Sequence, residues 1–372
     1  MTTIASLGDR LKYARERAGF TQTLVCERSG IGESSLSDFE RGKREPALAQ
    51  LATLADIYRR PAAFFLSTDP LPVEVVRWRE KPEQAEEIEV RFLRLCEQYQ
   101  NLESWCGASA ATALPTAERP KSPFGRRDAE SLAIQVRREL GLGDFPGPAL
   151  LHVLEEQCRL KVFHLSFAPT GTAASTKSAG FGGAVLLNEK NPKWRRNFDL
   201  AHELFHLLTW DFAPGHTDAE AQWSESDEKL ADAFAASLLM PTDAVRQAVD
   251  CRIRAGKVPV DALFEIARQF DVSVEALIWR IHALYGGNVN NRSRTDAMIQ
   301  RAREASGMFE QRTPEVPPER PARFVALALT ALREGNISAG RFAEYVGTSR
   351  QRAMEVVTEQ SGDDDAIELP PP

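Results

Sequence analysis

The sequence has little of what marks secreted, disulfide-stabilised or membrane-spanning chains. Its 372 residues include only five cysteines, which are scattered and never spaced as CxxC. Neither a disulfide framework nor a cysteine zinc site is therefore expected. We expect isolated, reduced thiols in the cytoplasm instead. No apolar run approaches the roughly 18 residues that a membrane-spanning helix needs. The N-terminal stretch also lacks the uninterrupted apolar segment of a signal peptide. These absences predict a cytoplasmic protein without a membrane segment.

The charge balance bears on whether the chain can bind nucleic acid. Hydrophobic residues make up 43% of the chain and charged residues 27%, which is typical of globular domains, and the length suggests two or three of them. A net charge of −7 would argue against nucleic acid if it were spread evenly. It is not, because residues 1–70 carry ten basic and nine acidic side chains, whereas the last twelve residues alone carry −4. A DNA-binding N-terminal region is therefore compatible with the overall charge.

Residues 1–68 are predicted to form a series of short helices. Thr21 is a suitable N-cap for a second helix that ends at Ser29, and Gly30 suits the tight turn before a third helix. Residues 7–66 resemble the XRE-type (Cro/repressor) helix-turn-helix family. The resemblance rests on Thr21-Gln22 opening the second helix, on Gly30 in the turn, and on Phe39-Glu40-Arg41-Gly42-Lys43 closing the third. It implies a DNA-binding domain that acts as a homodimer.

The resemblance also implies which side chains contact a double-stranded DNA operator. The third helix would present its N-terminal residues to base edges in the major groove, while Gln22 and the loop after the third helix hold phosphates. The expected base-reading residues are Glu33, Ser34, Ser35 and Asp38. The expected phosphate contacts are Gln22, Arg41, Lys43 and Arg44. Because the domain has a net charge near +1, we expect modest, salt-sensitive binding. The alternative is a protein-docking role for the same domain.

The most specific chemical pattern is Ala201-His202-Glu203-Leu204-Phe205-His206. Residues four apart share one face of a helix, so both imidazoles can hold one Zn²⁺ ion. Glu203 lies one position round the helix from His202, near enough to act as a general base. Because the chain has only six histidines, a chance HExxH is on the order of a 1% event. We therefore predict a zinc site, with Glu203 as the catalytic residue of a hydrolase.

A catalytic zinc ion needs a third protein ligand. The sequence HELFHLLTWDF lacks the glycine and third histidine that metzincins place soon after the motif. Glu228 and Asp232 stand four apart on the next predicted helix, which suits a ligand and a carboxylate that orients a ligating histidine. The alternatives for the third ligand are His216, Asp218 and Glu225. For stabilising an oxyanion, the candidates are Tyr285 and His164, although a histidine among apolar residues is more often part of a core.

Residues 197–210 and 228–241 together resemble the ImmA/IrrE family of zinc metallopeptidases. The family hallmark is a helix with an AHE-hydrophobic-x-H segment, followed by E-x-x-A-[DN]-x-x-A-x-x-LLMP, and both halves are present here. The resemblance spans roughly residues 126–285 and implies that His202, His206 and Glu228 bind zinc while Glu203 is the general base. It also implies a sheet edge at residues 182–188 beside the active site. Phe205 stands where a small residue is common in the family, which predicts a narrower cleft.

The expected fold is mostly α, of the α+β class, with an all-α helix-turn-helix domain followed by a zincin-like domain with a small β-sheet. Two β-like runs are expected at residues 160–167 and 181–187, separated by a loop of small residues at 168–180. The predicted organisation is a helix-turn-helix domain at 1–68, a linker and connecting helix at 69–125, a metallopeptidase domain at 126–285, a flexible connector at 286–320, a small helical unit at 321–358 and a disordered acidic tail at 359–372.

Three hypotheses about function use the same residues. In the first, a DNA-binding transcriptional regulator carries a zinc metallopeptidase domain that senses a signal or cleaves a partner protein, such as a repressor or antitoxin. In the second, the chain is a metallo-endopeptidase whose helix-turn-helix docks on protein. In the third, the metal domain is catalytically degenerate and acts as a ligand sensor. The Glu203→Gln variant separates hydrolysis from the other outputs, because it removes only the base.

Overall fold

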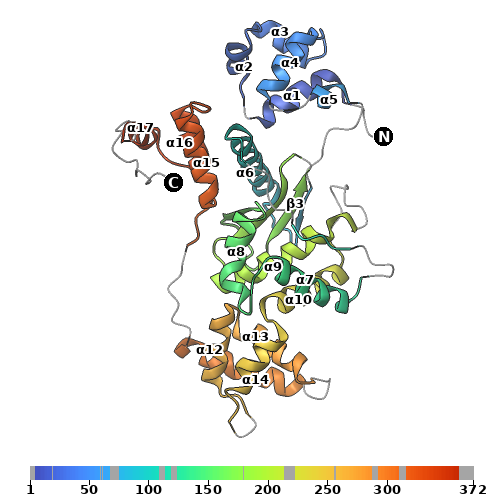
Figure 1. Cartoon of the computed structure of the whole chain (residues 1–372), viewed down its shortest axis with the longest axis vertical. Helices are drawn as coiled ribbons and strands as arrows, with labels where there is room; N and C mark the ends of the chain where they lie inside the picture. The colour runs from blue at the N-terminus through green and yellow to red at the C-terminus, as the bar shows by residue number, and fades with distance from the viewer. Residues whose placement is uncertain are drawn as a thin grey trace, which may run out of the picture.

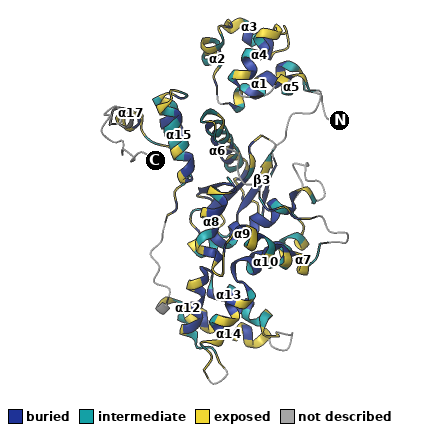
Figure 2. Cartoon of the chain, viewed as in Figure 1, coloured by how far each residue is buried: buried dark blue, intermediate teal, exposed yellow. Residues whose placement is uncertain are grey.

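The computed structural model shows packed helices around one small sheet (Figure 1). The described residues are 5–18, 20–58, 60, 62–67, 75–108, 114–118, 124–178, 180–212, 223–254, 257–286, 292–309 and 316–359. Their buried side chains form three hydrophobic cores, drawn dark blue in Figure 2. This mostly helical α+β architecture confirms the predicted fold class. Within the described ranges, no helix is both long enough and apolar enough to cross a bilayer.

Five short helices make up the N-terminal domain: α1 (Leu7–Arg17), α2 (Gln22–Ser29), α3 (Glu33–Glu40), α4 (Leu48–Ile57) and α5 (Ala62–Leu66). Thr21 caps α2, since its side-chain oxygen accepts a hydrogen bond of 3.2 Å from the backbone N–H of Leu24. Gly30 then turns the chain with a φ of 68°, a left-handed conformation that favours glycine. Leu36 and Phe39 are buried, which fixes the inner face of α3 and leaves its other face outward.

The sheet has four strands: β1 (Val76–Trp78), β2 (Lys161–Leu165), β3 (Ala174–Ser178) and β4 (Gly182–Asn188). Their order is β1-β3-β4-β2, with β2 parallel to β4 and the other pairs antiparallel. The two predicted apolar runs form β2 and β4. Sequence reasoning missed β1, in the expected linker, and β3, in the expected small-residue loop. Neither strand has an apolar run. The strand β1 forms by pairing with β3, which lies far along the chain, and β3 forms by pairing with β1 and with the adjacent β4.

Helices cover both faces of the sheet. On one face lies α6 (Ala85–Trp105), where the rings of Phe92 and Tyr99 each pack edge-on against Phe163 at 6.2 Å. On the other face lies α9 (Lys193–Thr209), which contacts β3 and β4. The C-terminal helices are α15 (Ala322–Arg333), α16 (Ala339–Val346) and α17 (Arg350–Glu359). Phe324 of α15 joins the core of α6 and the sheet, so these helices extend that core.

The N-terminal domain rests on the C-terminal half of α6. Phe20 stacks on Trp105 at 6.2 Å, and Trp105 in turn stacks on Tyr345 of α16 at 6.3 Å. An ion pair joins Arg17 of α1 to Glu97 of α6. These contacts hold α1 toward the body of the molecule, and Figure 1 shows α3 on the outer side of the domain.

The remaining helices are α7 (Arg126–Glu139), α8 (Pro146–Glu156), α10 (Glu225–Leu239), α11 (Thr242–Asp250), α12 (Val260–Phe270), α13 (Val274–Leu284) and α14 (Arg292–Phe309), with a 3₁₀ turn at Trp210–Phe212. Of these, α8 and α10 pack on α9, and α7 packs on α10. The chain turns between α12 and α13 at Asp271, whose φ is 53°. Residues 286–320, expected as a flexible connector, instead contain α14, which packs on α12 and α13. Ile299 and Ala302 are buried on one face of α14, and the many polar residues around them obscured this periodicity.

Candidate metal centre

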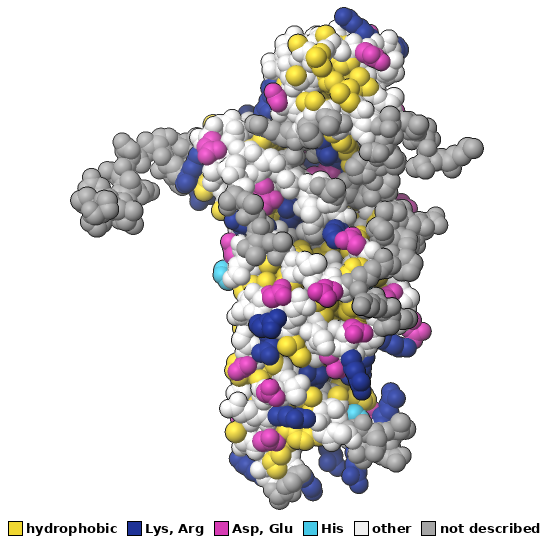
Figure 3. Space-filling view, turned by 45° about the vertical axis from the view of Figure 1, so that its right-hand side comes forward, with side chains coloured by type: hydrophobic (Ala, Val, Ile, Leu, Met, Phe, Trp, Pro, Cys, Tyr) yellow, Lys and Arg dark blue, Asp and Glu magenta, His cyan; other side chains and the backbone are white. Residues whose placement is uncertain are grey.

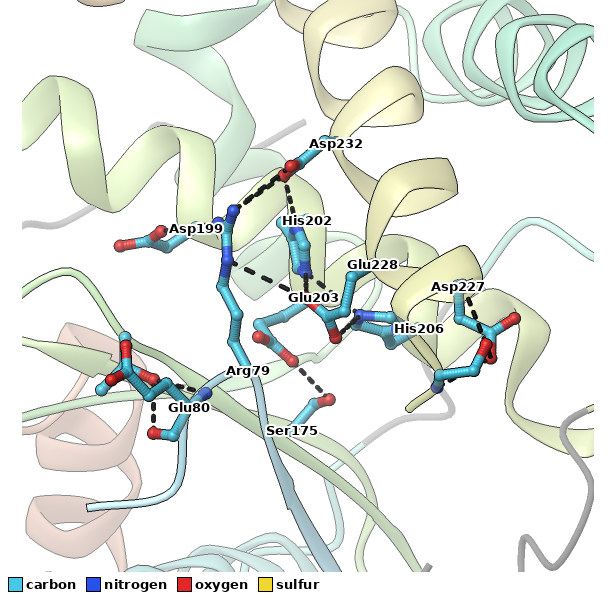
Figure 4. A network of polar contacts seen from close by, with 12 residues as sticks. Arg79, Glu80, Ser175, Asp199, His202, Glu203, His206, Asp227, Glu228 and Asp232 are labelled. Atoms are coloured by element: carbon cyan, nitrogen blue, oxygen red, sulfur yellow. Dashed lines mark hydrogen bonds and ion pairs between the residues drawn. The ribbon is translucent and has the colours of Figure 1, made fainter. Parts of the chain in front are cut away.

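The candidate metal centre lies between α9 and α10 (Figure 4). The HExxH helix α9 carries His202, Glu203 and His206, all of which are buried. The helix α10 carries Glu228 and Asp232 and packs directly on α9. Small residues make this close packing feasible, because Ala231 and Ala235 of α10 are fully buried. The sequence spacing on two helices thus brings five predicted side chains into one cluster.

The three predicted ligands have the geometry that a metal ion requires. The Nε2 atoms of His202 and His206 are 3.1 Å apart. One carboxylate oxygen of Glu228 lies 3.0 Å from Nε2 of His202, and the other lies 3.3 Å from Nε2 of His206. Tetrahedral zinc with bonds of about 2.0–2.1 Å places its ligand atoms roughly 3.3 Å apart. Two imidazoles and one carboxylate therefore fit a Zn²⁺ ion in both chemistry and spacing.

Hydrogen bonds orient the first histidine. Oδ1 of Asp232 lies 3.0 Å from Nδ1 of His202, so Asp232 fixes the ring with Nε2 turned toward Glu228. Burial opposes the charged form of His202, but hydrogen bonds to Asp232 and Glu228 outweigh it and raise the pKa of His202 to about 9. Burial lowers the pKa of His206 to about 4. A metal ion would replace the proton on His202, so metal affinity should rise with pH.

Glu203 lies on the inner side of the cluster, against the sheet. The hydroxyl of Ser175 on β3 donates a hydrogen bond of 2.6 Å to its Oε2 atom. No described residue forms a hydrogen bond with Oε1. Burial raises the pKa of Glu203 to about 7, because the charged carboxylate loses its solvation. A carboxylate in this state can exchange a proton near neutral pH, as a general base must.

Besides Ser175, sequence reasoning missed two further parts of the centre. Arg79, directly after β1, donates to both oxygens of Asp232 at 3.0 and 3.3 Å. Trp223, just before α10, stacks on His206 with ring centroids 4.2 Å apart and an angle of 13°. The guanidinium of Arg77 lies over Trp223 at 4.4 Å. A basic residue in a linker and a lone tryptophan carry no local signal, so only the folded chain reveals them.

A hollow of about 920 Å³ opens beside the metal centre. Arg79 and Asp232 are among its lining residues, whereas the three proposed ligands and Glu203 are not. Aromatic and basic side chains line the remainder, among them Trp194, Phe198, Trp279 and Arg126. Phe205 does not narrow the cleft as expected, because its ring is buried in the core against Phe124 and Phe234.

The other candidates from the sequence lie away from this cluster or cannot be placed. Glu225 is exposed and pairs with Lys229 at 2.6 Å, while His216 and Asp218 fall outside the described residues. The hydroxyl of Tyr285 donates to Asp250 at 2.7 Å. His164 lies on β2, where its Nδ1–H donates to the Pro318 carbonyl at 3.1 Å. Neither Tyr285 nor His164 belongs to the group of His202, His206 and Glu228.

The residues predicted to contact DNA lie on α3 and the loop that follows it. Glu33 and Ser34 are exposed, and Ser35 and Asp38 are half-buried. The basic residues Arg41, Lys43 and Arg44 are exposed in the loop. Gln22 is half-buried, and its side-chain amide donates to Glu40 at 2.8 Å. Glu40 also accepts two hydrogen bonds from Arg15, at 2.6 and 2.8 Å, so it braces α1 against α3.

Two models of known protein families match this chain, one in each of the two predicted domains. The family model described as the IrrE N-terminal-like domain matches residues 155–282, and a helix-turn-helix domain model matches residues 6–63. The HTH-type transcriptional regulator ImmR of Bacillus subtilis (strain 168) is 41% identical over 64 residues, which are 17% of this chain and 50% of that protein. The chain therefore aligns with about half the length of this curated relative.

Among solved structures, the crystal structure of Bacillus thuringiensis PlcR in complex with the peptide PapR7 and DNA covers 96% of both chains. Its sequence identity is 11% and its TM-score is 0.16, too low to support a shared arrangement. The family matches carry the assignment, and they confirm the predicted resemblance. A region that matches a helix-turn-helix domain model and a region that matches the IrrE N-terminal-like family are thus joined in one chain.

Proposed function

We propose that this chain is a DNA-binding transcriptional regulator whose IrrE-like domain is a zinc-dependent metallo-endopeptidase that cleaves a partner protein. The observation that carries the proposal is the convergence of His202, His206 and Glu228, whose ligand atoms all lie within 4.8 Å of one another. Glu203 is the general base beside these ligands. It is buried next to His202, and its Oε1 atom accepts no hydrogen bond from any described residue.

Each side chain around the centre has a separate role in the proposed hydrolysis of a peptide bond. When bound, zinc would supply Lewis-acid polarisation of a carbonyl and make water a better nucleophile near neutral pH. Ser175 holds Oε2 of Glu203, which leaves Oε1 to take a proton from the attacking water and pass it to the leaving amine. Burial keeps bulk water away from this carboxylate and holds its pKa near the working pH. Cleavage is favoured over signal sensing because a sensor needs no such base.

The substrate of the proposed peptidase is a repressor or antitoxin bound at the same operator. The hollow beside Arg79 and Asp232 is large enough for several residues of an extended polypeptide. Its aromatic lining suits apolar side chains of a substrate. The helix-turn-helix domain would bring the peptidase to DNA-bound protein, which raises the local concentration of the substrate.

The DNA-binding half of the proposal rests on the outward side of α3 and on its loop. Glu33 and Ser34 are exposed at the start of α3, where base-reading residues of such domains lie. The face seen in Figure 3 has hydrophobic side chains gathered on this domain. Leu48 and Leu66 of the domain are 79% and 63% exposed, which suits pairing with a second copy of the chain. A homodimer would double the phosphate contacts of a domain with little net charge.

The Glu203→Gln variant tests the proposal. We expect it to bind one zinc ion and to bind operator DNA as the native chain does, while it loses cleavage of the products of neighbouring genes. The control is Glu225→Gln, an exposed carboxylate of α10 that should leave all three measurements unchanged. Cleavage by purified Glu203→Gln protein would contradict the assignment of the base. Absence of stoichiometric zinc in the native protein would contradict the metal centre itself.

A further inference from the structure

Arg79 belongs to the segment that joins the two domains, and the sheet fixes its backbone beside the metal centre. The strand β1 pairs antiparallel with β3, with Arg77 opposite Ser175 and Trp78 opposite Ala174. The backbone N–H of Arg79 then donates to the carbonyl of Ala173 at 3.2 Å. The strand that receives these contacts is the one whose Ser175 holds Glu203. The joining segment therefore ends against the wall of the candidate centre.

The guanidinium of Arg79 reaches the carboxylates around His202 (Figure 4). Its Nη2 atom lies 3.0 and 3.3 Å from the two oxygens of Asp232. Its Nε atom lies 3.9 Å from Oε2 of Glu228, and its Nη1 atom lies 3.8 Å from Oδ1 of Asp199. A planar guanidinium holds a carboxylate in a defined orientation, which the single point charge of a lysine does not.

We propose that Arg79 is a positioning residue of the metal centre. It holds the carboxylate of Asp232 against Nδ1 of His202 and thereby presents Nε2 of His202 to the metal ion. The proposal rests on the metal-binding part of the proposed function, and it extends that function to a residue outside the two ligand-bearing helices. Through Arg79, the segment that follows the helix-turn-helix domain becomes part of the metal centre.

Two effects of Arg79 on a bound cation oppose each other, and they can be separated. Its positive charge repels a metal ion nearby, so loss of the charge alone would tighten zinc binding. Its contact with Asp232 orients a ligand, so loss of that contact would weaken zinc binding, by about 10–100-fold for residues in this position. Positioning through Asp232 therefore predicts weaker binding in Arg79→Met and no further weakening once Asp232 has been removed.

The first experiment measures zinc affinity by competition with a chromophoric chelator in the full-length chain. We expect Arg79→Met to bind zinc at least about tenfold more weakly, and Arg79→Lys, which keeps the charge, to be nearly as weak. The double variant Arg79→Met/Asp232→Asn should match Asp232→Asn within about threefold. The matched control is Arg126→Met, which removes a cation from the same hollow without touching Asp232. Unchanged or tighter binding in Arg79→Met, or effects that multiply in the double variant, would overturn the proposal.

The second experiment uses the reciprocity of coupled equilibria. If β1 stabilises zinc binding through Arg79, zinc must stabilise β1 to the same extent. We expect zinc to slow amide hydrogen exchange at residues 76–79 in the native chain and in Arg126→Met, but not in Arg79→Met, where α9 should still respond. Equal protection of residues 76–79 in Arg79→Met would refute the coupling. Failure of the native chain to bind zinc would instead refute the proposed function, so the two failures are distinguishable.

Discussion

Acid should weaken the sheet core through His164, which the metal centre does not use. The side chain lies on β2 and is 4% exposed. Burial and the nearby Arg196 guanidinium lower the pKa of His164 to about 4, although the carbonyl of Pro318 accepts a hydrogen bond from Nδ1. The unfolded chain has the ordinary value of 6.5 and binds the proton more readily. The stability that the neutral ring contributes is therefore complete above pH 6.5 and is lost as the pH falls toward 4.

The size of the effect follows from the two pKa values. At pH 4.5, which lies about 2 units below the pKa of His164 in the unfolded chain, the ring is protonated in the unfolded state but not in most folded molecules. This difference in proton binding stabilises the unfolded state by about 2.5 kcal/mol. The variant His164→Asn keeps an N–H donor near Nδ1 but cannot take up a proton. Between pH 7.5 and 4.5, the free energy of unfolding should fall for both proteins. The fall should be smaller for His164→Asn than for the native chain, and the difference should be about 2.5 kcal/mol.

Denaturant unfolding followed by tryptophan fluorescence at the two pH values measures the difference. His152→Asn is the control, because it makes the same substitution at a histidine that is exposed on α8 rather than buried in the sheet core. The comparison between variants removes the contribution of all other titrating groups. Parallel loss of stability in the native chain and His164→Asn would refute the reasoning.

Two further predictions concern the metal centre and the helix-turn-helix domain. Because Trp223 stacks on His206 at 4.2 Å, a titration with Co²⁺ should quench tryptophan fluorescence. Most of the quenching should vanish in Trp223→Phe but persist in Trp105→Phe, and equal quenching in all three proteins would place the metal elsewhere. Lys43→Ala should weaken binding to all DNA sequences by a similar factor and reduce the slope of log affinity against log salt by about 1, measured by fluorescence anisotropy. Lys177→Ala, a change in β3, is the control, and an unchanged slope in Lys43→Ala would exclude a phosphate contact.

Local patterns predicted the helices and the proposed ligands, because a helix repeats within a few residues. His202 and His206 stand four apart, as do Glu228 and Asp232, so each pair shares a helix face whatever the rest of the chain does. The caps of α2 and the turn at Gly30 are similarly local. What the sequence cannot give is the distance between α9 and α10, which depends on packing around the buried Ala231 and Ala235.

Contacts between distant segments escaped prediction for the same reason. Ser175 and Glu203 are 28 residues apart, and Arg79 and Asp232 are 153 apart. Ser175 lies on β3 and Arg79 directly follows β1, and neither strand has an apolar pattern that would signal it. The side chains that surround a predicted cluster are therefore harder to find than the cluster itself.

The positions of β1 and α6 determine where the chain can be truncated to give a fragment that still folds. A fragment that starts at residue 126 would contain every predicted ligand, yet it would leave β3 with an unpaired edge that invites aggregation. It would also strip Phe163 of its partners Phe92 and Tyr99. The smallest fragment that folds and binds metal should therefore begin near residue 75. This position lies within residues 69–125, which the sequence analysis assigned to a linker and connecting helix.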